Sequence, residues 1–129
     1  MSGPDFRFVY FTPIYDETVA FYRDRLGLAV VTSWDRAGDH RGTVFEAAGS
    51  GQIEVLELEG LERRPSHTAS GGPFAAVEVA DVDALHARLT ANGVATHYPI
   101  EDKPWGHRGF SVLDPNGVEI AFFSRSARA

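Results

Sequence analysis

The chain has 129 residues, 43% of them hydrophobic, which is enough for one compact domain with a real core. Its net charge of −6 argues against a nucleic-acid partner, and the lack of cysteine excludes disulfides, thiolate metal sites and thiol catalysis. No apolar run is long enough to span a membrane and the N-terminus lacks a signal-peptide core, so we expect a cytoplasmic protein without membrane contact.

The first half of the chain predicts a strand, a helix and three further strands. Phe6 to Thr12 is rich in strand-forming residues. Asp16 is a candidate helix cap, apolar residues follow it at helical spacing up to Leu26, and Gly27 suits the left-handed residue that ends a helix. The strands predicted after this helix are Leu28 to Trp34, Thr43 to Ala47 and Gln52 to Leu58.

The second half repeats this order after a linker at residues 60–72, which is rich in Gly, Ser and Pro. Asp81 is a candidate helix cap, and Asn92-Gly93 ends the helix. The predicted strands are Pro73 to Ala80, Val94 to Ile100, and the two arms of a hairpin over Pro104 to Phe123 that turns at Asp114-Pro115-Asn116-Gly117.

A constant spacing of 66 residues supports an internal repeat of strand-helix-strand-strand-strand. The pairs with this spacing are Gly27 and Gly93 at helix ends, Gly51 and Gly117 in hairpin turns, and Phe8 and Phe74 in strands. Each half alone has too small a core to be stable. The halves must therefore pair their sheets, within one chain or across a dimer.

Several motifs resemble those of the vicinal oxygen chelate superfamily, over nearly the whole chain from Phe6 to Phe123. They are the repeat itself, the helix exit Phe21-Tyr22-Arg23-Asp24-Arg25-Leu26-Gly27-Leu28 and the Asp114-Pro115-Asn116-Gly117 hairpin. That group includes glyoxalase I, extradiol dioxygenases, fosfomycin-resistance enzymes and bleomycin-resistance proteins. The run Pro104-Trp105-Gly106, followed by Arg108 and Phe110, is similar to the matching hairpin of the bleomycin-resistance proteins.

The resemblance implies an α+β fold in which two βαβββ modules pair into a curved mixed-sheet cleft, with the helices on the outside. We expect one domain over residues 1–129, with modules at 5–59 and 73–124 and the linker at 60–72 between them. A homodimer is implied as well, because the complete cleft of this fold often uses strands from both chains.

The metal site of the family is expected to be absent. In its metal-dependent members, His and Glu side chains project inward from four strands. By resemblance these positions fall on Arg7 or Phe8, on Val55 or (with a slip of one residue) Glu54, on Phe74, and on Ala121. A transition metal needs three or four nitrogen or oxygen donors, and at most one of these positions supplies one. We therefore expect no metal and no cofactor.

Strand alternation predicts which side chains face the cleft. The purely apolar sets, such as Val9 with Phe11 and Ile120 with Phe122, are expected to face the helices. The opposite sets combine aromatic rings with carboxylates, which suits a flat or cationic organic ligand. Trp34 and Trp105 are expected to close the ends of the cleft. The predicted ligand-binding residues are Phe8, Tyr10, Trp34, Val55, Glu57, Phe74, Glu78, Trp105, His107, Phe110, Ala121 and Phe123.

Three functions remain open. The preferred one is metal-independent binding of a small organic molecule, as in antibiotic sequestration. The second is a metal-independent lyase, isomerase or hydrolase with Tyr10, Glu57, Glu78 or His107 as acid or base, because an apolar cleft raises the pKa of a carboxylate. The third is a metalloenzyme with displaced ligands, for example Glu54, Glu57 and a loop histidine.

Overall fold

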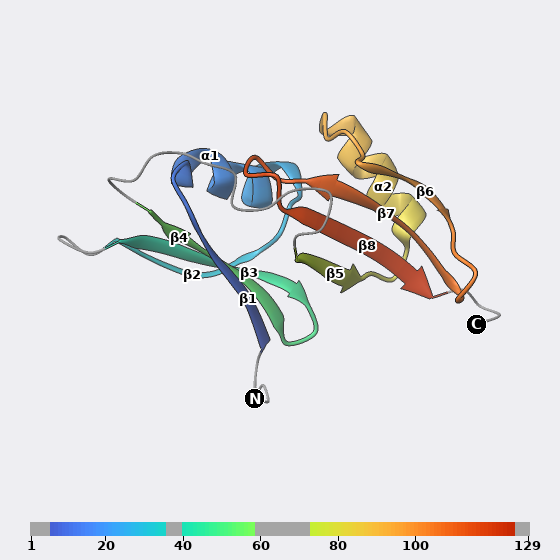
Figure 1. Cartoon of the computed structure of the whole chain (residues 1–129), viewed down its shortest axis with the longest axis horizontal. Coiled ribbons are helices and arrows are strands. Elements are labelled where there is room, and N and C mark those ends of the chain that lie inside the picture. Colours follow the sequence, from blue (N-terminus) through green and yellow to red (C-terminus); the bar gives the residue numbers. More distant parts are fainter. Residues whose placement is uncertain (1–5, 36–39, 59–72, 126–129) are drawn as a thin grey trace. The chain divides into compact units, whose positions relative to one another are not determined.

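The computed structural model describes residues 6–35, 40–58 and 73–125, which fall into two compact units, within Met1–Ser66 (unit 1) and within His67–Ala129 (unit 2). Each unit has one four-stranded mixed sheet with a helical segment, so the predicted α+β class and its two βαβββ modules are confirmed (Figure 1). The predicted linker lies outside the described residues. No helix in the described part of the chain is long and apolar enough to cross a membrane.

Unit 1 has the strand order β1-β4-β3-β2, in which β1 is parallel to β4 and the other pairs are antiparallel. Its elements are β1 (Phe6–Thr12), α1 (Tyr15–Ala20) with a π-helical continuation η1 (Phe21–Arg25), β2 (Val30–Asp35), β3 (Arg41–Ala48) and β4 (Gly51–Glu57). The helical segment covers one face of this sheet through Tyr22, whose ring contacts Phe45 and whose hydroxyl accepts a hydrogen bond from Tyr10.

The start of α1 differs from the prediction that Asp16 caps it. The helix begins at Tyr15 without a side-chain cap, and Thr12 at the end of β1 accepts the backbone N–H of Ile14 instead. Asp16 lies inside the first turn, where its carboxylate binds Arg41 at 3.0 Å. A carboxylate is favourable there because it opposes the positive end of the helix dipole. The predicted left-handed exit at Gly27 is confirmed by its φ of 76°.

Unit 2 repeats the topology, with the strand order β5-β8-β7-β6 and β5 parallel to β8. Its elements are β5 (Phe74–Glu78), α2 (Val82–Ala91), β6 (Tyr98–Asp102), β7 (His107–Leu113) and β8 (Glu119–Arg125). The predicted cap is confirmed, because Asp81 accepts the N–H of Ala84. The predicted hairpin turn is confirmed too: the buried Asp114 carboxylate accepts the N–H groups of Asn116 and Val118.

The repeat spacing within the sheets is 67 residues, and the predicted spacing of 66 applies only to the helix ends. Residues that pack toward the helical segments show this shift: Tyr10, Thr43 and Val55 in unit 1 correspond to Val77, Phe110 and Phe122 in unit 2. The predicted pairing of Gly51 with Gly117 is also wrong, because Gly49 is the glycine with positive φ in the first hairpin turn.

The predicted faces of unit 1 are reversed, because the hydroxyls of Tyr10 and Thr12 find hydrogen-bond partners on the helix side of the sheet. Successive strand residues point to opposite sides of a sheet, so the neighbouring apolar residues face the other way. Tyr10 and Val55 were expected to face away from the helix, but they are buried on its side. Val9 and Phe11 were expected to face the helix, and they are exposed instead. In unit 2 the predicted faces agree with the structure: Ile120 and Phe122 are buried, and the alternate residues of β8 are more accessible.

Candidate functional site

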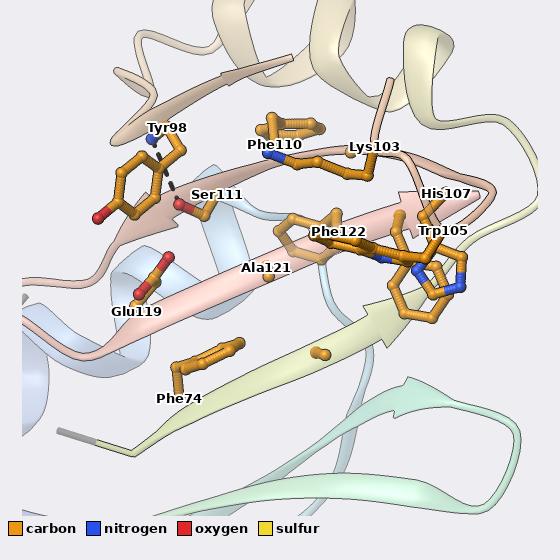
Figure 2. A pocket seen from close by; sticks show the side chains of 13 residues that line it. Phe74, Tyr98, Lys103, Trp105, His107, Phe110, Ser111, Glu119, Ala121 and Phe122 are labelled. Atoms are coloured by element: carbon orange, nitrogen blue, oxygen red, sulfur yellow. Dashed lines mark hydrogen bonds between the residues drawn. The ribbon is translucent and has the colours of Figure 1, made fainter. Parts of the chain in front are cut away.

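A pocket of about 420 Å³ lies on the sheet of unit 2 (Figure 2). Its walls come from all four strands of the unit and from the turn that joins β6 to β7. The alternate residues Glu119, Ala121 and Phe123 of β8 line it together with Phe122, while Ile120 is buried in the core. The volume lies within the range of small-molecule sites.

The hollow arises from a row of small side chains across three neighbouring strands. Ala121 of β8 pairs with Ala76 of β5 on one side and with Ser111 of β7 on the other. The next rows carry larger side chains, Phe74 with Glu119 on one side and Glu78 with Phe123 on the other. The short middle row therefore leaves a floor between two higher ends.

One end of the pocket is built by rings held on a tight turn. Trp105 stands in the turn closed by hydrogen bonds between Lys103 and both Gly106 and His107, and the residue is 67% exposed. The His107 ring stacks on Phe123 at 4.2 Å between centroids, with 15° between the planes. This end offers flat, partly exposed apolar area, which suits stacking with a planar group.

The other end carries a carboxylate. Glu119 lies there with Phe74 and Tyr98, and no described residue donates a hydrogen bond to its side chain (Figure 2). At the opposite end Lys103 is already paired with Glu101 at 2.7 Å. The lining therefore contains one negative charge that no ion pair neutralises among the described residues.

Six of the twelve predicted ligand-binding residues border this pocket: Phe74, Trp105, His107, Phe110, Ala121 and Phe123. The Phe110 ring, however, packs on the helix side, at 5.0 Å from the His86 ring of α2. Glu78 pairs with Phe123 in the row at the ring end of the pocket, but it is not a lining residue and binds Arg125 at 3.0 Å.

The five predicted residues in the first half lie in unit 1 and are not part of this pocket. Tyr10 and Val55 are buried on the helix side of their sheet, and Phe8 contacts Tyr10 through its ring. The indole of Trp34 lies against Gly42 and leaves no room for a Cβ there. Trp34 therefore packs on its own sheet.

Glu57, the fifth of these residues, is tied to Arg41. The Arg41 guanidinium donates to its carboxylate at 2.8 Å, and this hydrogen bond lowers the pKa of Glu57 below its ordinary value. The expectation of a raised pKa, which a general base requires, is wrong for this residue. The cause is the arginine, which also binds Asp16 and lies over the Tyr15 ring.

The Arg41–Glu57 pair predicts an acid-dependent loss of stability. A lowered pKa means that Glu57 stabilises the fold above the pKa of an unfolded glutamate, about 4.3, and that this contribution disappears as the pH falls further. In urea unfolding at pH 6, the free energy of unfolding of Glu57→Gln should be lower than that of the parent. The gap between the two should narrow below about pH 4. Glu17→Gln, which removes an exposed carboxylate from α1, is the control. A pH-independent difference would contradict this account.

The structure does not assemble the displaced metal site considered above. Glu54 binds Arg7 at 2.9 Å and Glu57 binds Arg41, and the two carboxylates project from opposite faces of β4. No group of three or more His, Asp or Glu side chains among the described residues is placed to hold a metal ion. In the repeat spacing of 67, Arg7 and Glu54 correspond to Phe74 and Ala121. The four positions named by resemblance thus present an ion pair, a phenyl ring and a methyl group, which do not fit a metal ion.

Tyr98, Lys103, Ser111 and Glu119 line the pocket but are missing from the predicted set. Alternation predicts that Glu119 faces the cleft together with Ala121, although the predicted ligand-binding set omits it. None existed for Tyr98 and Lys103, since the pairing of β6 with β7 is irregular between Tyr98 and Glu101.

The chain is similar to known proteins. Residues 6–122 match the model of the Glyoxalase/Bleomycin resistance protein/Dioxygenase superfamily. A diaminopimelate epimerase of Herminiimonas arsenicoxydans is 28% identical over 103 residues, which are 79% of this chain and 36% of that protein. The chain thus spans about a third of the length of this curated relative.

Solved structures share the fold. TnmS3, an antibiotic binding protein from Streptomyces sp. CB03234, is 21% identical with a TM-score of 0.74, over 96% of this chain and 97% of its own. TioX from Micromonospora sp. ML1 is 25% identical with a TM-score of 0.72, over 95% and 99%. A glyoxalase/bleomycin resistance protein/dioxygenase from Nocardioides is 21% identical with a TM-score of 0.71, over 100% and 88%.

Proposed function

The chain belongs to the Glyoxalase/Bleomycin resistance protein/Dioxygenase superfamily, and from this we propose that it is a metal-independent protein that binds a small organic molecule in the pocket of unit 2. The observation that carries the proposal is the pocket itself, with small side chains on its floor and stacked rings at one end. The ligand is aromatic or cationic.

Binding rather than catalysis is supported by the state of the candidate acid–base groups. The Tyr10 hydroxyl bonds to Tyr22, and Glu57 and Glu78 bind Arg41 and Arg125. His107 alone among these candidates lines the pocket, and it does so as a stacked ring. Such a site holds a ligand by shape, ring contact and charge.

Antibiotic sequestration is the form of binding that we propose, because TnmS3 is an antibiotic binding protein of the same fold. Sequestration lowers the concentration of free drug stoichiometrically and so requires tight binding, about −10 kcal/mol for a Kd of tens of nanomolar. We also propose that the chain acts as a homodimer, for which sedimentation would give twice the 14.1 kDa of one chain.

Tryptophan fluorescence tests the proposal. The chain has two tryptophans, so a Trp34→Phe variant leaves Trp105 in the pocket as the only reporter. We expect titration with bleomycin, mitomycin C and planar aromatic compounds to change its emission for at least one of them. The change should persist in EDTA, because the proposed site uses no metal. No change with any compound, or loss of the change in EDTA, would overturn the proposal.

A further inference from the structure

We propose that the pocket selects an arylalkylamine, an organic cation in which a protonated amine and a planar ring are joined by a short chain. This inference rests on the proposed function and specifies its ligand. Glu119 binds the amine, and the ring lies toward Trp105 and His107 at the opposite end (Figure 2).

The charge of the pocket lining points to a cationic ligand. The pocket lining contains one carboxylate, Glu119, and one lysine, Lys103, besides the imidazole of His107. Lys103 is paired with Glu101, whereas the Glu119 carboxylate has no partner among the described residues. A half-buried carboxylate beside Phe74 and Tyr98 is incompletely hydrated, so a ligand cation that binds it recovers a charge-assisted hydrogen bond.

The distance between the two ends of the pocket calls for a ligand with separated groups. Glu119 and Phe123 are four residues apart on one strand, about 13 Å along β8. Between them the floor is the methyl group of Ala121, flanked by Ala76 and Ser111. A flat group cannot contact both ends at once, so a ligand that uses both needs a narrow linker over this floor.

The two ends of the pocket also set the orientation of the ligand. The His107–Phe123 stack and the exposed Trp105 ring provide planar area at one end. The Lys103–Glu101 ion pair lies at that end and offers a ligand cation no free carboxylate, whereas Glu119 does. The geometry therefore orients the ligand with the ring at the turn between β6 and β7 and the amine at the start of β8.

Three compounds of nearly equal shape test this selection: 4-phenylbutylamine, 4-phenyl-1-butanol and 4-phenylbutanoic acid. By calorimetry, the parent protein should bind the amine roughly tenfold more tightly than the alcohol and the acid most weakly. Glu119→Gln should bind amine and alcohol equally and leave the affinity for the alcohol unchanged, which shows that the pocket is intact. Glu119→Lys should reverse the order and prefer the acid.

Glu17→Gln is the matched control, because it removes one negative charge from the surface of α1 in unit 1. It should keep the preference for the amine, which separates the local carboxylate from the net charge of −6. Equal binding of all three compounds by the parent, or an amine preference that survives Glu119→Gln, would contradict the proposed selection of an arylalkylamine. It would leave the proposal that the pocket binds a ligand intact. If none of the three compounds and none of the larger aromatic panel binds, the proposed function falls with it.

Discussion

Replacing Ala121 by Trp should weaken ligand binding roughly a hundredfold or more while the protein stays folded. Ala121 is the central residue of the short row that forms the pocket floor, between Ala76 and Ser111. An indole at this position fills the space between the Glu119 end and the ring end, so no ligand can reach both. Because the pocket side of Ala121 is half-exposed, the larger side chain does not have to enter the core.

Calorimetry is the measurement of choice, since an added tryptophan disturbs the fluorescence signal. Ala87→Trp provides the matched control: the same side chain is placed on an exposed position of α2, outside the pocket lining. The control should bind like the parent. If Ala121→Trp also binds like the parent, the ligand occupies another part of the protein.

Truncation of Phe45 to Ala should lower the free energy of unfolding by about 3–5 kcal/mol, the largest effect on stability that we expect. The Phe45 side chain is 0% exposed and its ring contacts Tyr22 at 5.5 Å, so its loss leaves a cavity between the sheet of unit 1 and its helical segment. Urea unfolding at neutral pH measures the change.

Phe6→Ala is the comparison for this truncation, because it removes the same ring from an exposed position at the start of β1. Its effect should stay within about 0.5 kcal/mol, as is usual for surface positions. Comparable losses in the two variants would show that the core of unit 1 is not centred on Phe45.

The order of elements could be read from the sequence because its signals are local. Asp81 accepts the N–H of Ala84, and Gly27 and Gly93 take the positive φ that ends a helix. In each case one residue type satisfies one backbone requirement, whatever lies elsewhere in the fold. The Asp114 turn is a further example, since its carboxylate binds amides only two and four residues away.

The faces of the strands were harder to predict, because an apolar pattern does not show which side of a strand meets the helix. In unit 1 the hydroxyls of Tyr10 and Thr12 have hydrogen-bond partners on the helical segment, so the set with polar groups is the one buried against it. In β8 of unit 2 the purely apolar residues Ile120 and Phe122 are the buried ones, as predicted.

The sequence by itself determined the repeated βαβββ order and with it the α+β class, because these follow from residue types and from short-range spacing. It also named Trp105, His107 and Phe123, by resemblance to a family, and these line one end of the pocket. Only the tertiary structure decided that Arg41 binds Glu57, that Lys103 is paired with Glu101, and that Glu119 has no partner among the described residues. The physical reason is that the charge state and availability of a side chain depend on which neighbours the fold brings to it, and those neighbours can be distant in the chain.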